Sequence, residues 1–152
     1  MKTSNLINLF FILLMGATVI TTSTSCESEG CTDPNAENFD ADADNDDGTC
    51  ILAREKFLGT YDLTENCSTG ADSYTLTITA SSTSDENIVI ANFYAFSTIT
   101  ASVNGETFTF DQTEDTINYS GTGTISGNTV TINYTASLNG QEDICSAICI
   151  KQ

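Results

Sequence analysis

The sequence predicts an all-β protein whose main domain, residues 51–152, is an eight-stranded antiparallel up-and-down barrel, preceded by a disulfide-closed acidic loop. Three observations carry this prediction. Apolar residues recur at every second position through most of the domain, and Thr, Ser, Ile, Val, Tyr and Phe dominate it. Turn residues separate these runs about every ten residues, which suits short antiparallel strands. After the first 25 residues, only residues 51–58 are helix-permissive. A β-sandwich made of two flat sheets is the alternative.

The expected strands follow one another with a turn signal between most neighbours. Asn104-Gly105, between two alternating runs, is a strong hairpin signal. Asn139-Gly140 marks the turn before the last strand. Gly121 and Gly123 fall on an inward face, where missing side chains would permit the bend of a barrel. The strands are expected near residues 61–64, 74–80, 87–96, 99–103, 108–110, 117–125, 130–136 and 144–150.

The first 25 residues have the three parts of a secretory signal peptide. Lys2 supplies positive charge, residues 6–20 form a mostly apolar run, and small residues lead to Cys26. The run is shorter than the roughly 20 residues of a transmembrane helix. This N-terminus resembles the relaxed lipoprotein signals of Bacteroidetes-type bacteria. The resemblance implies Cys26 as a lipid anchor, residues 26–30 as a tether, and a location at the outer membrane or cell surface. Ordinary cleavage without lipidation is the alternative.

Residues 31–50 form an acidic module with one cysteine at each end. Asp40, Asp42, Asp44 and Asp46 alternate along it, and Gly48 permits a turn. Calcium takes six to eight oxygen ligands, so alternating carboxylates in a short loop are typical of a calcium site. A solvated, disulfide-closed acidic spacer is the alternative.

The block from Gly30-Cys31-Thr32-Asp33-Pro34 to Asp47-Gly48-Thr49-Cys50 resembles the acidic repeats of Bacteroidetes surface and secreted proteins. More loosely, it is similar to thrombospondin type 3 calcium repeats. The resemblance implies that Cys31 and Cys50 close the loop around bound calcium. The ligating residues that it implies are Asp33, Asn38, Asp40, Asp42, Asp44, Asp46 and Asp47.

Six cysteines in an exported chain indicate disulfides, and the absence of histidine excludes a mixed cysteine–histidine zinc site. The two cysteines that bracket the acidic module form the best pair, and closing their loop would stabilise the protein by about 3 kcal/mol in the chain-entropy model. Cys67, near the start of the β-domain, could pair with Cys145 or Cys149 near its end, and we predict Cys145. If Cys26 carries lipid, one cysteine stays free.

The net charge of −17 is strongly acidic, and only Arg54, Lys56 and Lys151 are basic after the signal region. Such a charge repels nucleic acid, so no nucleic-acid partner is expected. Without histidine, no Ser-His-Asp or Cys-His arrangement can form. A glycoside hydrolase, the remaining enzymatic alternative, would need two inward carboxylates that face each other in a cleft, and the alternation argues against this. We therefore predict that the protein is not an enzyme. The acidic residues of the β-domain are expected in turns or on outward positions, mainly Asp72, Asp85, Glu86, Asp115, Glu142 and Asp143.

The segment Phe57-Leu58-Gly59-Thr60-Tyr61 is similar to the Gly-x-Trp start of lipocalin-type barrels, with Tyr in the Trp position. The resemblance implies a barrel that carries a small apolar ligand. An eight-stranded barrel is just wide enough for side chains or one small ligand, and we expect the side chains to fill it. The aromatic residues that would line the interior are Tyr61, Tyr74, Phe93, Phe96, Phe108, Phe110, Tyr119 and Tyr134.

Together, these features predict an exported, lipid-anchored protein with a non-catalytic binding or structural role at the outer membrane or cell surface. Its N-terminal module would be stabilised by calcium, and its partner would be the membrane together with an unidentified surface partner. The alternative is a lipocalin-like carrier of a small apolar ligand.

Overall fold

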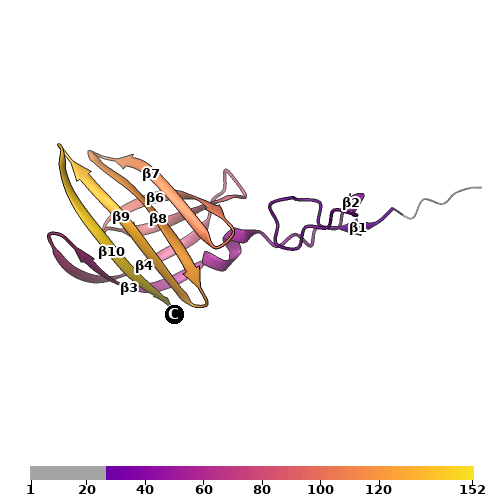
Figure 1. Cartoon of the computed structure of the whole chain (residues 1–152), viewed down its shortest axis with the longest axis horizontal. Helices are drawn as coiled ribbons and strands as arrows, with labels where there is room; N and C mark the ends of the chain where they lie inside the picture. Colours follow the sequence, from indigo (N-terminus) through magenta and orange to yellow (C-terminus); the bar gives the residue numbers. More distant parts are fainter. Residues whose placement is uncertain (1–26) are drawn as a thin grey trace, which may run out of the picture.

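The computed structural model describes residues 27–152, so the predicted signal peptide and Cys26 lie outside the described residues. Eight strands close into one antiparallel barrel in the order β10-β3-β4-β5-β6-β7-β8-β9 (Figure 1). The predicted barrel is confirmed, and the two-sheet alternative is wrong. The barrel strands are β3 (Gly59–Cys67), β4 (Gly70–Ala80), β5 (Asn87–Phe93), β6 (Ser97–Asn104), β7 (Thr107–Glu114), β8 (Ile117–Ser126), β9 (Thr129–Leu138) and β10 (Gln141–Lys151).

Alternating burial explains why these residues form strands. In β6, every second side chain from Ser97 is buried and those between are exposed, which is the pattern of a strand with one face on a core. The barrel closes where β10 pairs with β3, with Cys145 opposite Cys67. In the turn before β10, Asn139 and Gly140 have φ angles of 52° and 79°, which suit an Asn-Gly hairpin turn.

A short 3-10 helix, η1 (Ala53–Phe57), closes one end of the barrel, which we call the stalk end. Phe57 is fully buried, and its ring centroid lies 5.4 Å from that of Phe108 in an edge-on contact. Tyr61 donates a hydrogen bond to the carbonyl oxygen of Phe57 at 2.7 Å. Arg54 donates to the carbonyl oxygen of Ser84 at 2.7 Å. These contacts fix η1 across the opening of the barrel.

Aromatic rings pack the barrel interior. The ring centroid of Phe93 lies 5.4 Å from that of Phe110 and 4.7 Å from that of Tyr134. Gly123 faces the ring of Phe108, and a Cβ atom built on this glycine would lie 2.0 Å from the ring's Cζ atom. Its position on an inward face predicted a role in bending the strand, and in the structure Gly123 also leaves room for a ring. The largest fully buried side chains are Tyr61, Tyr119, Phe57, Phe93, Phe108, Leu63, Leu76, Ile78, Ile88, Ile90, Ile99 and Ile132.

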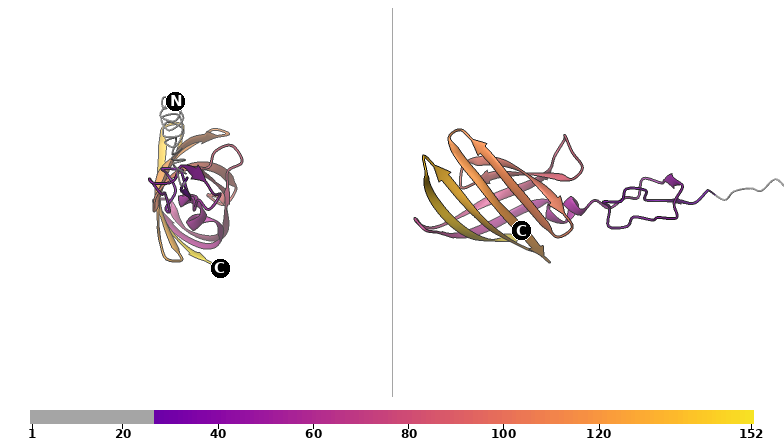
Figure 2. Two further views of the ribbon diagram at one scale, coloured as in Figure 1. Left: turned by 90° about the vertical axis from the view of Figure 1, so that its right-hand side faces the viewer. Right: turned by 45° about the horizontal axis from the view of Figure 1, so that its top comes forward.

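Residues 27–50 form an acidic stalk, which extends from the barrel beside η1 (Figures 1 and 2). Its two short strands, β1 (Glu29–Gly30) and β2 (Asn45–Asp46), pair in parallel. A disulfide joins Cys31 to Cys50, as predicted. Because the stalk is too small to bury an apolar core, this bridge and its backbone hydrogen bonds hold it together.

Polar groups join the stalk to the barrel. Asn35 donates a hydrogen bond to Glu86 at 2.8 Å, and Lys56 forms an ion pair with Glu37. Within residues 27–152, none of the helical segments has the length and apolar character needed to span a membrane.

Candidate functional site

Two carboxylates lie inside the barrel towards the distal end, which is the end opposite η1 and carries the turns at 68–69, 94–96, 115–116 and 139–140. Glu65 on β3 is 4% exposed and Asp143 on β10 is 7% exposed. The expectation that Asp143 is outward is wrong, and sequence reasoning missed Glu65. The inward position of both carboxylates could have been predicted from the expected disulfide between Cys67 and Cys145. Cys67 alternates on one face with Leu63 and Glu65, so its cross-strand partner Cys145 and then Asp143 must share that inward face.

Two tyrosine hydroxyls hold the Glu65 carboxylate. Its Oε2 atom accepts hydrogen bonds from Tyr134 at 2.5 Å and from Tyr74 at 3.1 Å. Burial, followed by the Glu65 charge and hydrogen bond, raises the pKa of both phenols, so both remain protonated donors. Within the described residues, the Oε1 atom of Glu65 accepts no hydrogen bond.

Asp143 is held by the turn between β3 and β4 and by a tyrosine. Its carboxylate accepts hydrogen bonds from the hydroxyls of Thr69 at 2.5 Å and Ser68 at 2.7 Å, and from the backbone N–H of Thr69 at 3.1 Å. The hydroxyl of Tyr94 adds a fourth at 3.0 Å. These bonds, the Thr69 side chain first, lower the pKa of Asp143, so the group is a carboxylate at neutral pH.

The turn between β5 and β6 places Tyr94 over the distal end of the core. Tyr94 and Ala95 have φ angles of 50° and 66°, and the N–H of Phe96 donates to the carbonyl oxygen of Phe93 at 3.2 Å. The Tyr94 ring centroid lies 5.8 Å from that of Tyr119. Phe96 is 67% exposed, so the expectation that it lines the interior is wrong. Because the turn reverses the chain at Tyr94 and Ala95, Tyr94 takes the place over the core instead.

A pocket of about 310 Å³ opens beside this turn. Its lining combines both buried carboxylates with two aromatic residues whose ring centroids are 5.8 Å apart, Tyr94 and Phe96. Thr69, Gly70 and Asp72 also line it, near the turn between β3 and β4. The sequence pattern showed none of this grouping, because the members come from three separate parts of the chain.

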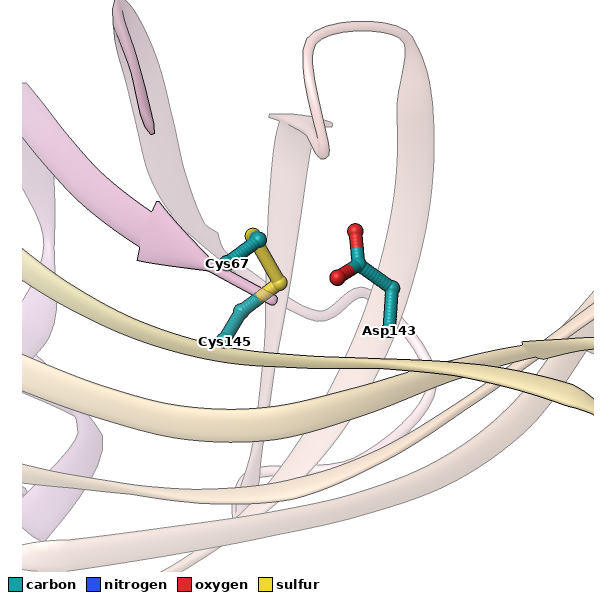
Figure 3. A group of neighbouring side chains, drawn as sticks. All are labelled: Cys67, Asp143 and Cys145. Atoms are coloured by element: carbon teal, nitrogen blue, oxygen red, sulfur yellow. A yellow bond between two sulfur atoms is a disulfide. The ribbon is translucent and has the colours of Figure 1, made fainter. Parts of the chain in front are cut away.

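A disulfide borders the same pocket. Cys67 and Cys145 are bonded, as predicted, and their sulfur atoms lie within 4.8 Å of a carboxylate oxygen of Asp143 (Figure 3). A bonded pair of sulfurs offers no thiolate, so this group does not have the chemistry of a metal centre. Cys149 is the one free thiol among the described residues, and burial raises its pKa to about 12.

The positive charges of the described chain all lie at the stalk end. Arg54 pairs with Asp85 at 2.8 Å. Lys56 lies on η1, and the Lys151 side chain borders Gly59 at the start of β3. The distal end of the described barrel therefore holds carboxylates and no cation. Five of the six acidic residues expected in turns or outward positions are exposed: Asp72, Asp85, Glu86, Asp115 and Glu142.

The stalk carboxylates that were predicted as calcium ligands accept hydrogen bonds within the loop. Asp33, Asp40 and Asp46 each accept a hydrogen bond from the backbone N–H two residues later, at 2.9 to 3.0 Å. Asp47 does the same for Thr49, whose hydroxyl also donates to it and, as the largest cause, lowers its pKa. Asp42 is exposed, and Asp44 accepts a weak bond from the N–H of Ser28 at 3.4 Å.

Asn38 closes the loop with both atoms of its amide. Its nitrogen donates to the carbonyl oxygen of Thr49 at 2.7 Å, and its oxygen accepts from the N–H of Ile51 at 2.6 Å. In the part of the chain that the structure describes, no three stalk carboxylates bring their oxygens within 4.8 Å of one another.

Comparison with family models, curated proteins and solved structures gives no match for this chain.

Proposed function

We propose that the protein is an exported lipoprotein with a non-catalytic binding or structural role at the outer membrane or cell surface. The observation that carries the proposal is the arrangement of the two ends of the barrel. The acidic stalk enters beside η1, and the pocket with Glu65 and Asp143 lies at the opposite end. With lipid on Cys26, directly before the stalk, the distal end would project away from the membrane.

The non-catalytic part of the proposal is supported by how the buried acids are used. Asp143 is occupied by four hydrogen-bond donors, and Glu65 is bound by two tyrosines. Both carboxylates are therefore engaged by hydrogen bonds within the barrel, and the chain has no histidine to act as a general base. These features favour a binding or structural role over a catalytic one.

Anchoring and display are tested by expressing the full chain and its Cys26→Ser variant in a Bacteroidetes-type host. The expected result is that the wild type is found in the membrane fraction and that an antibody against the barrel stains intact cells. The Cys26→Ser variant should move to the soluble exported fraction, because it lacks the thiol that would receive lipid. A wild-type chain that is soluble, or stained only after cell lysis, would contradict the proposal.

A lipocalin-like carrier of a small apolar ligand is the second candidate, supported by η1 closing one end of an eight-stranded barrel. The aromatic rings around Phe93 occupy the space that a ligand would need. Organic extraction of the exported Cys26→Ser protein, followed by mass spectrometry, separates the two candidates. We expect no stoichiometric apolar compound; one equivalent per chain would favour the carrier.

Calcium binding by the stalk is a separate proposal that rests on its alternating carboxylates and on the resemblance described above. It requires the stalk loop to rearrange so that several carboxylates meet at one ion. We expect the exported Cys26→Ser protein to gain mass corresponding to calcium in native mass spectrometry and to lose it with chelator, at the weak affinities typical of extracellular modules. The Asp42→Asn, Asp44→Asn double variant should bind less. No calcium-dependent mass would identify the stalk as a spacer.

A further inference from the structure

We propose that the distal pocket binds an organic ammonium group. The two carboxylates that it contains are buried at 4% and 7% exposure, yet all their partners are neutral hydroxyls or a backbone N–H. Buried carboxylates are normally paired with a cation, because the loss of hydration is costly. The three cations of the described chain lie at the other end of the barrel. A bound cation would complete this pocket.

Glu65 provides the open acceptor. Both of its hydrogen bonds end on Oε2, so Oε1 has no donor within residues 27–152, and Glu65 belongs to the pocket lining. An ammonium group donates up to three hydrogen bonds and carries the complementary charge. Asp143, whose lowered pKa keeps it charged, lies in the same lining and adds attraction.

The aromatic residues favour an organic cation over a metal ion. Tyr94 and Phe96 both line the pocket, and the Phe96 side chain is exposed. A ring face attracts an ammonium group and its alkyl chain, whereas a calcium ion needs six to eight oxygens. The four donors already on Asp143 reduce what it can offer to a metal.

Backbone strain at the β5–β6 turn supports a functional site at this position. Tyr94 and Ala95 hold positive φ angles that non-glycine residues rarely adopt. This conformation places the Tyr94 hydroxyl on Asp143 and leaves Phe96 beside the pocket. The inference deepens the proposed binding role by naming the class of ligand, and the pocket can be tested independently of lipid anchoring.

The test is a titration of the full exported chain, carrying Cys26→Ser, with n-butylammonium chloride at low ionic strength. The protein contains five tyrosines and no tryptophan, so tyrosine fluorescence reports on the barrel, and calorimetry gives the affinity. We expect saturable binding of n-butylammonium and none of n-butanol, which has the same alkyl chain without the charge. A blocked tripeptide with a central lysine, compared with n-butylammonium, distinguishes a protein lysine from a free amine as the source of the group.

Three variants assign the binding to the pocket. Glu65→Gln should weaken n-butylammonium binding by about tenfold or more, because it removes a charge-assisted hydrogen bond. Phe96→Ala changes an exposed side chain, should keep the fold, and should weaken binding by about threefold. Glu142→Gln is the control, since it removes an equal charge from an exposed distal residue outside the pocket lining; it should leave the affinity within about twofold.

The proposal is wrong if n-butanol binds as well as n-butylammonium, if binding never saturates, or if Glu142→Gln weakens binding as much as Glu65→Gln. Stoichiometric displacement of n-butylammonium by calcium would identify a metal site and would also overturn it. Circular dichroism of Glu65→Gln excludes unfolding as the cause of lost binding, and Phe96→Ala gives an answer even if Glu65→Gln does not fold. Failure in this titration leaves the surface-staining result unaffected, so the two proposals are judged separately.

Discussion

The bridge between Cys67 and Cys145 should contribute a large share of the stability of the barrel. It joins the first and last barrel strands across 78 residues of sequence. In the chain-entropy model, a loop of this length corresponds to about 4.5 kcal/mol of unfolding free energy, because the bridge restricts the unfolded chain. The perturbation is the double variant Cys67→Ser, Cys145→Ser. A single variant would leave one thiol free to pair with Cys149, which lies on the same face of β10.

The assay is urea denaturation followed by far-ultraviolet circular dichroism, in oxidising and in reducing buffer. For a slope of about 2 kcal/mol per molar urea, the double variant should unfold at about 2 M lower urea than the wild type in oxidising buffer. In reducing buffer the two proteins should unfold together. The Cys31→Ser, Cys50→Ser variant is the control, because it removes a bridge in the stalk and should leave the barrel transition unchanged.

Two results would refute this reasoning. Equal midpoints in oxidising buffer would mean that the bridge does not stabilise the barrel through the unfolded chain. A lower midpoint of the double variant that persists in reducing buffer would assign the loss to the packing of the two side chains instead.

Three further predictions concern the barrel interior. Gly123→Ala should destabilise the barrel by about 1–3 kcal/mol or more, since the new Cβ would lie 2.0 Å from a Phe108 ring atom, and adding Phe108→Leu should restore part of the loss in urea melts. Because the pKa of Asp143 is lowered in the folded protein, its contribution to stability is present above the ordinary aspartate pKa of 3.8 and is lost as the pH falls through the lowered pKa. Urea melts at several pH values should therefore show the Asp143→Asn variant less stable than the wild type at pH 7, with the difference shrinking as the pH falls below 3.8; a constant difference would contradict the assignment. The buried Cys149 thiol, with its pKa raised to about 12, should resist a thiol reagent at pH 8 until urea unfolds the chain, whereas labelling of the native protein would show that β10 opens.

Most of the strands could be predicted from the sequence, because their signals are local, but the strand expected at 87–96 ends at Phe93. Alternation predicted the two faces of β6, and Asn104-Gly105 predicted the hairpin that follows it. Alternation also assigned Tyr119 and Gly121 to the inward face of β8. Each of these predictions depends only on residues within one strand or one turn.

The faces of β10 could not be read in the same way. Ile144, Ile148 and Ile150 point outward with 63%, 53% and 57% exposure, while Asp143 and Cys145 point inward. Hydropathy favours the opposite orientation. The orientation is decided by barrel closure, since Cys145 must meet Cys67, and that pairing joins residues from opposite ends of the domain.

The pocket could not be predicted, because the turn between β5 and β6 that lines it has no recognisable turn sequence. The pairing of β5 with β6 shifts between Ala91 and Phe93, and the following Tyr94 and Ala95 adopt positive φ without a glycine. Turn chemistry normally assigns such positions to Gly, Asn or Asp. The sequence therefore placed Phe96 in the core, and the role of Tyr94 could be seen only in three dimensions.

The pairing of β3 with β10 also sets when the protein can fold. Neighbouring hairpins such as β8–β9 can form as soon as both strands have been made, but the barrel stays an open sheet until residues 141–151 arrive. Contacts between the ends of a domain slow folding, because a long loop must be ordered before they form. Closure of the barrel is thus expected to wait for residues 141–151, and Cys67 must keep a free thiol until Cys145 has been synthesised.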